Sequence, residues 1–137
     1  MAIRIRPVEY YYTMVEDRPG EAFRLLTSLA AAEVNLLAFN IVPVGANSTQ
    51  LLLFPEHAAG LARVAERTGL VISGPQQALL IQGDDELGAL VGVHQKLYEA
   101  GVNVYAANGV NDGKGSYGYV VYLRPEGFEA ALRALGL

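Results

Sequence analysis

The sequence of 137 residues contains no cysteine, no tryptophan and only two histidines. Without cysteine the chain can form no disulfide framework and has no thiolate to serve as a nucleophile or a metal ligand. Neither His57 nor His94 has a second histidine at ligand spacing, so the sequence predicts no metal site and no cofactor. We expect His94 to be a core histidine that is satisfied by one hydrogen bond.

Long apolar runs and an excess of basic residues are also absent. No stretch of 18 apolar residues and no charged leader before an apolar run occurs, which argues against a membrane span and a secretory signal. We therefore expect a soluble, cytoplasmic protein. The net charge is -4, with acidic and basic residues interspersed. Because no basic stripe is present to neutralise phosphates, nucleic acid is not an expected partner.

Sequence motifs typical of enzymes are also absent. The sequence has no paired histidine and carboxylate at a readable spacing, no glycine-rich phosphate loop and no lysine in an apolar run. Most of the eight tyrosines fall on expected strands, where an aromatic face can stack RNA bases, but the basic aromatic signature of such sheets is absent. The sequence favours a non-catalytic protein whose tyrosines are interface and core residues.

What the chain does contain is an internal repeat. Sliding the sequence by 68 residues lays Asp85–Asn108 over Asp17–Asn40 with eight identities in 24 positions. The identical pairs are Asp17/Asp85, Gly20/Gly88, Leu29/Leu97, Ala32/Ala100, Val34/Val102, Asn35/Asn103, Ala38/Ala106 and Asn40/Asn108. They fall in a turn, on a helix face and at a strand start, as expected of a duplicated unit. We predict one module at residues 1–74, with an N-terminal extension at 1–8, and a second module at 78–137.

The first copy predicts the order strand, helix, strand, strand, helix, strand. The expected strands are Tyr10–Val15, Leu36–Val44, Thr49–Phe54 and Leu70–Ser73. One helix follows the turn at Asp17–Gly20, and a second opens at Pro55 and ends before a left-handed Gly69. In the first helix we expect Glu21, Arg24 and Ser28 to point away from the sheet and an apolar stripe to face it; the stripe is Ala22, Leu25, Leu26, Leu29 and Ala30.

This order is the βαββαβ plan of a ferredoxin-like sandwich. The second copy repeats it after a joint at Gly74–Gln77, and its expected elements are Leu79–Gln82, a helix at Gly88–Ala100, Val102–Val110, Tyr117–Leu123 and a helix from Pro125. We therefore predict an α+β fold of two tandem ferredoxin-like units, in which antiparallel sheets are backed by helices.

The second copy has no sequence left for its own fourth strand, and an unfilled sheet edge favours aggregation. We expect Ile3–Pro7 to fill that place, in the same chain or in a partner chain. Because proline cannot donate to a strand ladder, Pro7 predicts that this segment lies at a sheet edge or in a separate short strand.

The turn Asp17–Gly20, which opens an amphipathic helix and is followed by Val34 and Asn35 at a strand start, resembles the ACT domain family. The second copy keeps Asp85, Gly88, Val102 and Asn103, but Leu87 stands where the proline would be. The resemblance implies non-catalytic regulatory modules of the ferredoxin-like plan. Such modules bind amino acids or other small metabolites, mostly where two of them pair, and they regulate an attached enzyme or transcription factor.

The resemblance implies ligand contact for a set of residues in each turn: Asp17, Arg18, Pro19, Gly20 and Asn35 in the first copy, and Asp85, Gly88 and Asn103 in the second. The chemistry of these residues agrees. Free N–H groups at a helix N-terminus favour a carboxylate, glycine allows close approach to the backbone, and asparagine both donates and accepts. Each residue also has a structural interpretation, because aspartates cap helices and asparagines and glycines serve turns.

Asn40 and Asn108 lie inside apolar strands, where an unpaired amide would cost about 1 to 3 kcal/mol. If the two copies pair about a pseudo-twofold axis, these asparagines could meet each other or a ligand at that interface, and we expect them to pair with each other or with the backbone. The 52% hydrophobic composition further suggests a homodimer. The leading hypothesis is a regulatory protein that binds an amino acid, and the alternative is a dimerisation module that binds no ligand.

Overall fold

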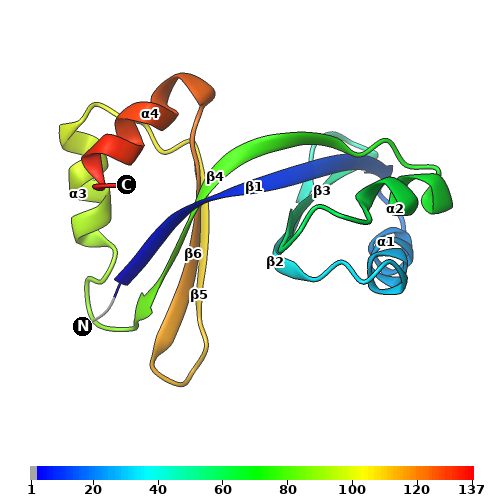
Figure 1. Cartoon of the computed structure of the whole chain (residues 1–137), viewed down its shortest axis with the longest axis horizontal. Coiled ribbons are helices and arrows are strands. Elements are labelled where there is room, and N and C mark those ends of the chain that lie inside the picture. The colour runs from blue at the N-terminus through cyan, green and yellow to red at the C-terminus, as the bar shows by residue number, and fades with distance from the viewer. Residues whose placement is uncertain (1–2) are drawn as a thin grey trace. The chain divides into compact units, whose positions relative to one another are not determined.

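The computed structural model describes residues 3–137 (Figure 1). Its elements are β1 (Ile3–Glu16), α1 (Glu21–Ala31), β2 (Leu36–Pro43), β3 (Ser48–Pro55), α2 (Leu61–Thr68), β4 (Ser73–Asp84), α3 (Val91–Glu99), β5 (Ala106–Asn111), β6 (Ser116–Tyr122) and α4 (Pro125–Ala134). The strand order is β2-β3-β1-β4-β6-β5, and the pairs β1/β3, β2/β3, β4/β6 and β5/β6 are antiparallel. The predicted α+β class, with antiparallel strands backed by helices, is confirmed.

The chain divides into two compact units, one of Glu9–Gln76 and one of Met1–Val8 with Gln77–Leu137. In the unit of Glu9–Gln76, α1 packs beside α2 and both cover the sheet. The core between these layers is apolar and fully buried at its centre, where Leu25, Leu51, Leu53 and Val64 meet. Alternation along β3 explains the layer, because Leu51 and Leu53 point to the same face of the strand.

The other unit repeats this construction with α3, α4, β5, β6 and the later part of β4. Leu79, Ile81, Leu97 and Val121 form the centre of its core, and Ile5 of β1 packs against that core. The N-terminal segment therefore belongs to this unit, in agreement with the expectation that Ile3–Pro7 supplies its missing strand.

Pro7 does not interrupt β1, which runs without a break from Ile3 to Glu16. The pairing of β1 with β3 begins only at Tyr11, so Pro7 has no β3 residue opposite it and is exposed. A missing N–H group is tolerated at such an edge position. Of the two alternatives left open by the sequence, the edge position is the one observed.

Three predicted boundaries were wrong. Pro55 is the buried last residue of β3 and opens no helix; α2 begins at Leu61 behind a left-handed Gly60. The predicted joint at Gly74–Gln77 lies inside β4, which replaces the short fourth strand. The strand predicted from Val102 begins only at Ala106 and leaves Tyr105 outside it. The left-handed Gly69 after α2 and the start of α4 at Pro125 are confirmed.

Gly74 shows why a turn signal was misread in β4. A Cβ atom at this position would lie 2.8 Å from the Tyr11 ring and 3.0 Å from the carbonyl oxygen of Tyr10, and its φ is +134°. The glycine allows β4 to approach β1 closely, which is the use of glycine inside a strand rather than between elements.

The buried face of α1 is rotated relative to the predicted stripe. Glu21, Ser28 and Leu29 are buried together with Leu25, whereas Leu26 is exposed. The predicted assignment of Leu26 and Ala30 to the core, and of Glu21 and Ser28 to solvent, was wrong. The small Ser28 permits close packing, and the carboxylate of Glu21 is satisfied by arginines, as described below.

Asn40 and Asn108 lie on the outer strands β2 and β5. Asn108 is exposed and Asn40 is half-buried, so neither amide is enclosed in a core as the sequence suggested. No helix among residues 3–137 is long and apolar enough to cross a membrane.

Thr13 of β1 is a polar residue buried in the core. Its side chain is 2% exposed, and its hydroxyl has no hydrogen-bond partner among the described residues. The residue 68 positions later is Ile81, which is fully buried in the corresponding core. An unsatisfied buried hydroxyl destabilises the folded state because its hydration is lost without compensation.

We expect Thr13→Val, which replaces the hydroxyl by a methyl group of similar size, to raise the free energy of unfolding by about 1 kcal/mol. The measurement is urea unfolding followed by circular dichroism. The matched control is Ile81→Thr, which should lower the same quantity by about 2 kcal/mol because it creates the unsatisfied group. A Thr13→Val protein less stable than the parent would contradict this account.

Candidate functional site

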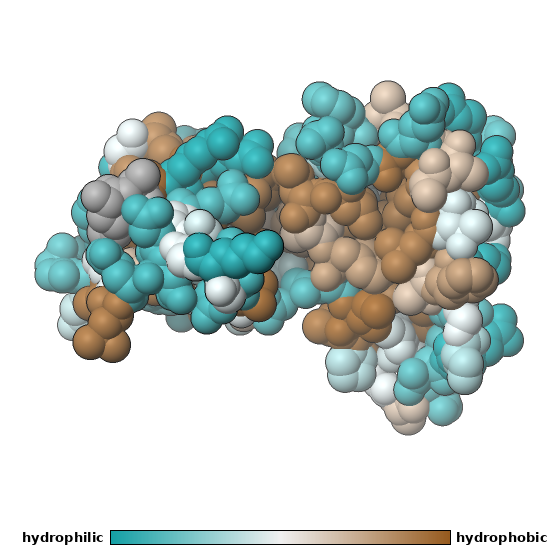
Figure 2. All heavy atoms as spheres, turned by 90° about the horizontal axis from the view of Figure 1, so that it is seen from below, coloured by the Kyte–Doolittle hydropathy of each residue, from teal (hydrophilic) through white to brown (hydrophobic). Residues whose placement is uncertain are grey.

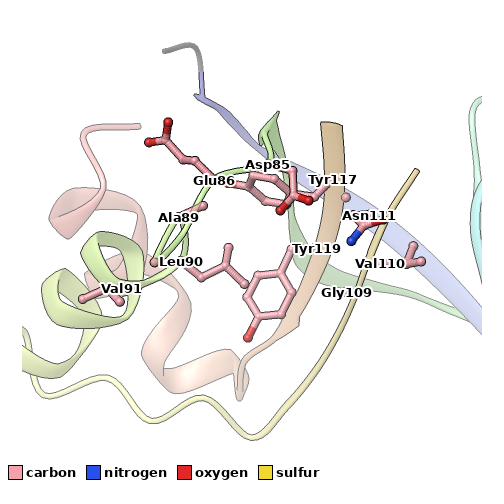
Figure 3. A pocket seen from close by; sticks show the side chains of 12 residues that line it. Asp85, Glu86, Ala89, Leu90, Val91, Gly109, Val110, Asn111, Tyr117 and Tyr119 are labelled. Carbon is pink, nitrogen blue, oxygen red and sulfur yellow. The ribbon is translucent and has the colours of Figure 1, made fainter. Parts of the chain in front are cut away.

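Two pockets open at corresponding places in the two units, each where a strand turns into a helix. The first corner pocket, of about 200 Å³, is lined by Val15–Arg18, Gly20–Phe23, Ile41, Thr49 and Leu51. The second corner pocket, of about 470 Å³, is lined by Asp85–Glu86, Gly88–Val91, Gly109–Asn111 and Tyr117–Tyr119 (Figure 3). The offset of 68 residues carries Asp17, Gly20, Thr49 and Leu51 onto Asp85, Gly88, Tyr117 and Tyr119.

The two corners share two backbone features, although α1 begins directly after Gly20 and α3 begins only at Val91, three residues after Gly88. Gly20 and Gly88 both adopt left-handed conformations, with φ of +94° and +74°. The amide of Asp17 donates to the carbonyl of Asn47 at 2.9 Å, and the amide of Asp85 donates to the carbonyl of Gly115 at 2.9 Å. A left-handed residue is inexpensive only as glycine, so each corner requires its glycine for the turn itself.

Asp17 and Asp85 do not cap the helices that follow them. The N-cap positions are Gly20 for α1 and Leu90 for α3, and neither helix start receives a side-chain cap. The alternative interpretation of these aspartates as helix caps was therefore wrong. The first N–H groups of both helices lack the side-chain acceptor that usually satisfies them.

The structure brings some of the predicted site residues together and leaves others apart. Asp17, Arg18 and Gly20 line the first corner pocket, and Asp85 and Gly88 line the second. Among the described residues, the linings do not include Pro19, Asn35 or Asn103; all three are exposed. The carbonyl of Asn35 accepts from the amide of Glu56 at 2.8 Å, which ties the start of β2 to the end of β3.

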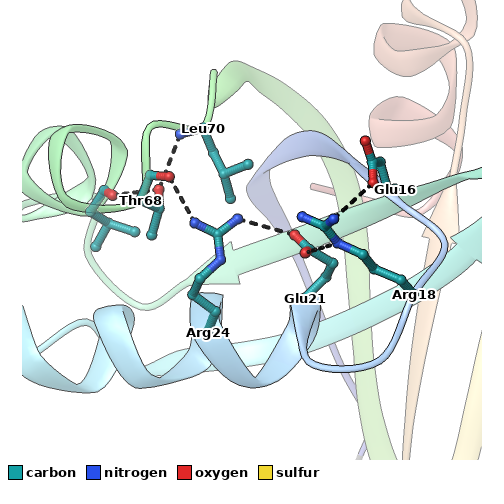
Figure 4. Close-up of polar contacts among 7 residues, drawn as sticks. Glu16, Arg18, Glu21, Arg24, Thr68 and Leu70 are labelled. Carbon is teal, nitrogen blue, oxygen red and sulfur yellow. Dashed lines mark hydrogen bonds and ion pairs between the residues drawn. The ribbon is translucent and has the colours of Figure 1, made fainter.

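An ion network begins at the wall of the first corner pocket, where Glu16, Arg18 and Glu21 line it, and continues to Arg24 outside the lining (Figure 4). The carboxylate of Glu21, with its side chain 11% exposed, accepts from Arg18 at 2.8 Å and from Arg24 at 3.1 Å. Arg18 also pairs with Glu16 at 3.0 Å, and Arg24 donates to the carbonyl of Thr68 at 2.9 Å. The hydrogen bonds from Arg18 and then Arg24 hold the pKa of Glu21 below its usual value.

The second corner pocket is aromatic and acidic (Figure 3). Tyr117 and Tyr119 project from β6, and both are half-buried. Burial raises the pKa of both hydroxyls; for Tyr117 the nearby carboxylates of Glu86, Asp84 and Asp85 raise it further. Asp85 and Glu86 themselves are exposed and form no ion pair within the described part of the chain.

Tyr119 is held in place from two sides. Its hydroxyl shares a hydrogen bond with Nε2 of His94, with 2.8 Å between the two atoms. A Cβ atom at Gly109, directly across the β5/β6 ladder, would lie 2.7 Å from the Tyr119 ring, so glycine is needed for the ring to lie there. The single hydrogen bond predicted for His94 is confirmed, although the residue is half-buried.

Sequence reasoning missed Glu21, Tyr117, Tyr119 and Gly109 as parts of these corners. The repeat pairs Gly109, Tyr117 and Tyr119 with Ile41, Thr49 and Leu51, and no local pattern in the sequence marks either set as part of a site. Antiparallel pairing then brings β5 and β6 beside the turn. No group of three or more histidine or acidic side chains among residues 3–137 is arranged to hold a metal ion.

No protein-family model matches the sequence, and no curated protein matches it either. Solved structures do match. Protein BT0572 from Bacteroides thetaiotaomicron is 17% identical with a TM-score of 0.80, over 96% of this chain and 88% of that one. The regulatory subunit of aspartate kinase from Thermus thermophilus, in its ligand-free form, is 16% identical with a TM-score of 0.65, over 98% and 94%.

The regulatory subunit of aspartate kinase from Thermus flavus is 15% identical with a TM-score of 0.58, over 99% of this chain and 95% of that one. At such identities the likeness shows the fold. The chain has the fold of the ACT-type regulatory domains of aspartate kinase, so the resemblance noted in the sequence is confirmed at the level of the fold.

The Glu21 network predicts a pH dependence of stability. A carboxyl whose pKa is lower in the folded than in the unfolded chain stabilises the fold above the unfolded pKa, and this contribution disappears as the pH falls through the folded pKa. We expect the free energy of unfolding to exceed that of Glu21→Gln near pH 7, and the difference to shrink as the pH falls below about 4.5, the usual pKa of this side chain.

The measurement is urea unfolding of both proteins between pH 7 and pH 3. Glu66→Gln, which removes an exposed carboxylate of α2, is the matched control and should show a much smaller difference at pH 7. A Glu21→Gln difference that stays constant over this range would show that the lowered pKa of Glu21 does not contribute to folding.

Proposed function

We propose that this chain, which has the fold of ACT-type regulatory domains, is a non-catalytic regulatory protein of two ACT-like modules that binds a small molecule, an amino acid. The modules are the two copies of the repeat, predicted at residues 1–74 and 78–137, with Ile3–Val8 contributing to the sheet of the second. The observation that carries the proposal is the corner itself. Both copies keep a left-handed glycine, an uncapped helix start and a pocket at one place.

A free amino acid fits the chemistry of the second corner pocket. Its carboxylate can lie at the start of α3, where the helix dipole favours an anion. Its ammonium can face the carboxylates of Asp85 and Glu86, and its side chain can lie on Tyr117 and Tyr119. The volume of about 470 Å³ lies within the range of small-molecule sites.

The residues proposed from the sequence take different roles here. Asp85 and Gly88 would contact the ligand in the second corner, as would Asp17, Arg18 and Gly20 in the first. Pro19, Asn35 and Asn103 would act indirectly, by holding the turns that shape the corners. A ligand can regulate a partner enzyme or transcription factor only if it binds one conformation of the corner more tightly than another.

The alternative function is dimerisation without a ligand, and exposed apolar side chains favour it. In the unit of Glu9–Gln76 they are Met14, Phe23, Leu26, Ile41, Val44 and Val71. Figure 2 shows hydrophobic surface gathered on the body at the right, which is the unit that contains α1 and α2. In the other unit Val110 is 75% exposed on the outer strand β5. We propose a homodimer, because outer strands with exposed apolar residues are ready to pair.

We expect at least one amino acid to raise the thermal unfolding temperature in a screen of all twenty. A ligand at a hundredfold excess over its Kd stabilises the folded state by about 2.7 kcal/mol. Gly88→Val should abolish the shift, because a β-branched residue is strained in the left-handed region and projects into the corner. Gly113→Val, at an equally left-handed glycine in the β5–β6 turn, is the matched control for backbone strain. Loss of stability in both variants with no shift in the parent would favour the dimerisation module.

Dimerisation through the outer strands is tested by mass in solution. We expect twice the chain mass by size-exclusion chromatography with light scattering, and a single chain for Val110→Lys or Ile41→Lys, depending on which outer strand pairs. A charge directed into a pairing strand blocks association. The control is Val71→Lys, an exposed position outside the strands. A dimer that persists in all three variants would exclude the outer strands as its interface.

A further inference from the structure

The two corner pockets share a left-handed glycine and differ in their side-chain chemistry. The first is lined by Glu21, whose carboxylate pairs with two arginines, and its volume is less than half that of the second. Every charged member of this clamp is replaced in the second copy. By the offset of 68 residues, Arg18, Glu21 and Arg24 correspond to Glu86, Ala89 and Gly92.

Glu21 places a carboxylate at the start of α1, on the wall of the first corner pocket. It is the first residue of α1, it lines the pocket, and its side chain is almost completely shielded from solvent. An acidic group at a helix N-terminus is stabilised by the helix dipole, as a ligand carboxylate would be. The arginines on either side complete the neutralisation, so the corner already holds an anion of its own.

In the second corner the residue that corresponds to Glu21 carries no carboxylate. Ala89 has no polar atoms beyond the backbone, and Gly92 has no side chain. The charges that remain are the carboxylates of Asp85 and Glu86, which lack ion partners and lie close enough to Tyr117 to raise its pKa. The lining includes no arginine or lysine among the described residues.

We propose that Glu21 closes the first corner pocket as a built-in carboxylate, so that each chain binds one ligand, in the second corner pocket. We further propose that the side chain of this ligand is uncharged or cationic, because Asp85 and Glu86 repel an acidic one. Both statements rest on the proposed function, and they deepen it by giving the stoichiometry and the ligand class.

Isothermal titration calorimetry with L-phenylalanine, L-lysine and L-aspartate tests the second corner. We expect one molecule of phenylalanine or lysine per chain and no binding of aspartate. Ala89→Glu, which copies Glu21 into the second corner, should weaken that binding by at least about tenfold. Gln77→Glu adds the same charge at an exposed site on β4 and should leave binding unchanged. Two ligands per chain, preferred binding of aspartate, or an Ala89→Glu protein that binds normally would overturn the proposal.

Chemical rescue tests the first corner independently of any amino acid. Glu21→Ala leaves Arg18 and Arg24 around a space of carboxylate size. We expect sodium acetate to raise the urea midpoint of this variant more than sodium chloride at equal ionic strength does. Glu21→Gln, which still fills the space, should show no such difference. Equal effects of acetate and chloride on Glu21→Ala would overturn the closure of the first corner.

The two experiments separate the two levels of inference. If acetate rescues Glu21→Ala while none of the twenty amino acids binds, the proposed function fails together with the ligand assignment, and the closure by Glu21 stands. If an amino acid binds in the second corner and acetate does not rescue, the proposed function stands and the built-in carboxylate is refuted.

Discussion

Each pair of helices must be covered by a sheet of four strands, and the rest of the structure follows from this. Two amphipathic helices present apolar stripes that must be covered, and a narrower sheet would leave part of one stripe in water. In the unit of Glu9–Gln76, β1 and β4 flank one another and the hairpin of β2 and β3 completes the sheet. In the other unit, the N-terminal part of β1 supplies the fourth strand, and Ile5 reaches that core. β1 and β4 are long because each contributes to the sheets of both units. Pro7 is tolerated because it lies in the part of β1 that has no β3 residue opposite it.

The repeat preserves three backbone features of the corners and changes their side chains, and it also shifts the start of the helix from Glu21 in α1 to Val91 in α3. A left-handed glycine, a hydrogen bond from the aspartate amide to the facing hairpin, and an uncapped helix start recur in both copies. These features are set by the geometry of a strand that turns into a helix above a sheet. Side chains at the corner are free of that constraint, so one copy can carry a clamped carboxylate and the other two tyrosines. Similar folds therefore do not imply equal ligand affinity in the two copies.

The sequence predicted the fold well where a single residue type decides the local structure. Pro125 at a helix start and Gly69 after a helix end are examples. It failed where tertiary packing decides. Pro55 carries a helix-start signal but is buried at a strand end, and Ser28 replaces Leu26 on the buried face of α1 because its partners come from distant segments.

The candidate site likewise contains some residues that the sequence predicted and others that it did not. The glycines of the corners were visible because they recur in a repeated turn, whereas Tyr119 and Gly109 become neighbours only through the β5/β6 ladder. The arginine clamp was hidden for another reason. Arg18, Glu21 and Arg24 have the spacing of ordinary surface pairs on a helix, and only the burial of Glu21 distinguishes them from solvated charges.

The second corner also shows how occupancy could reach the rest of its unit. Tyr119 lines the pocket and is tied through its hydroxyl to His94, one turn into α3, while Leu90 lines the pocket at the start of the same helix. A ligand that moves the Tyr119 ring must therefore act on α3, whose Val93 and Leu97 are buried in the core. A rigid helix converts a small displacement at its start into a displacement of its whole length, because core packing does not deform continuously. The side of α3 that carries Tyr98 lies outside this core, since Tyr98 is 82% exposed.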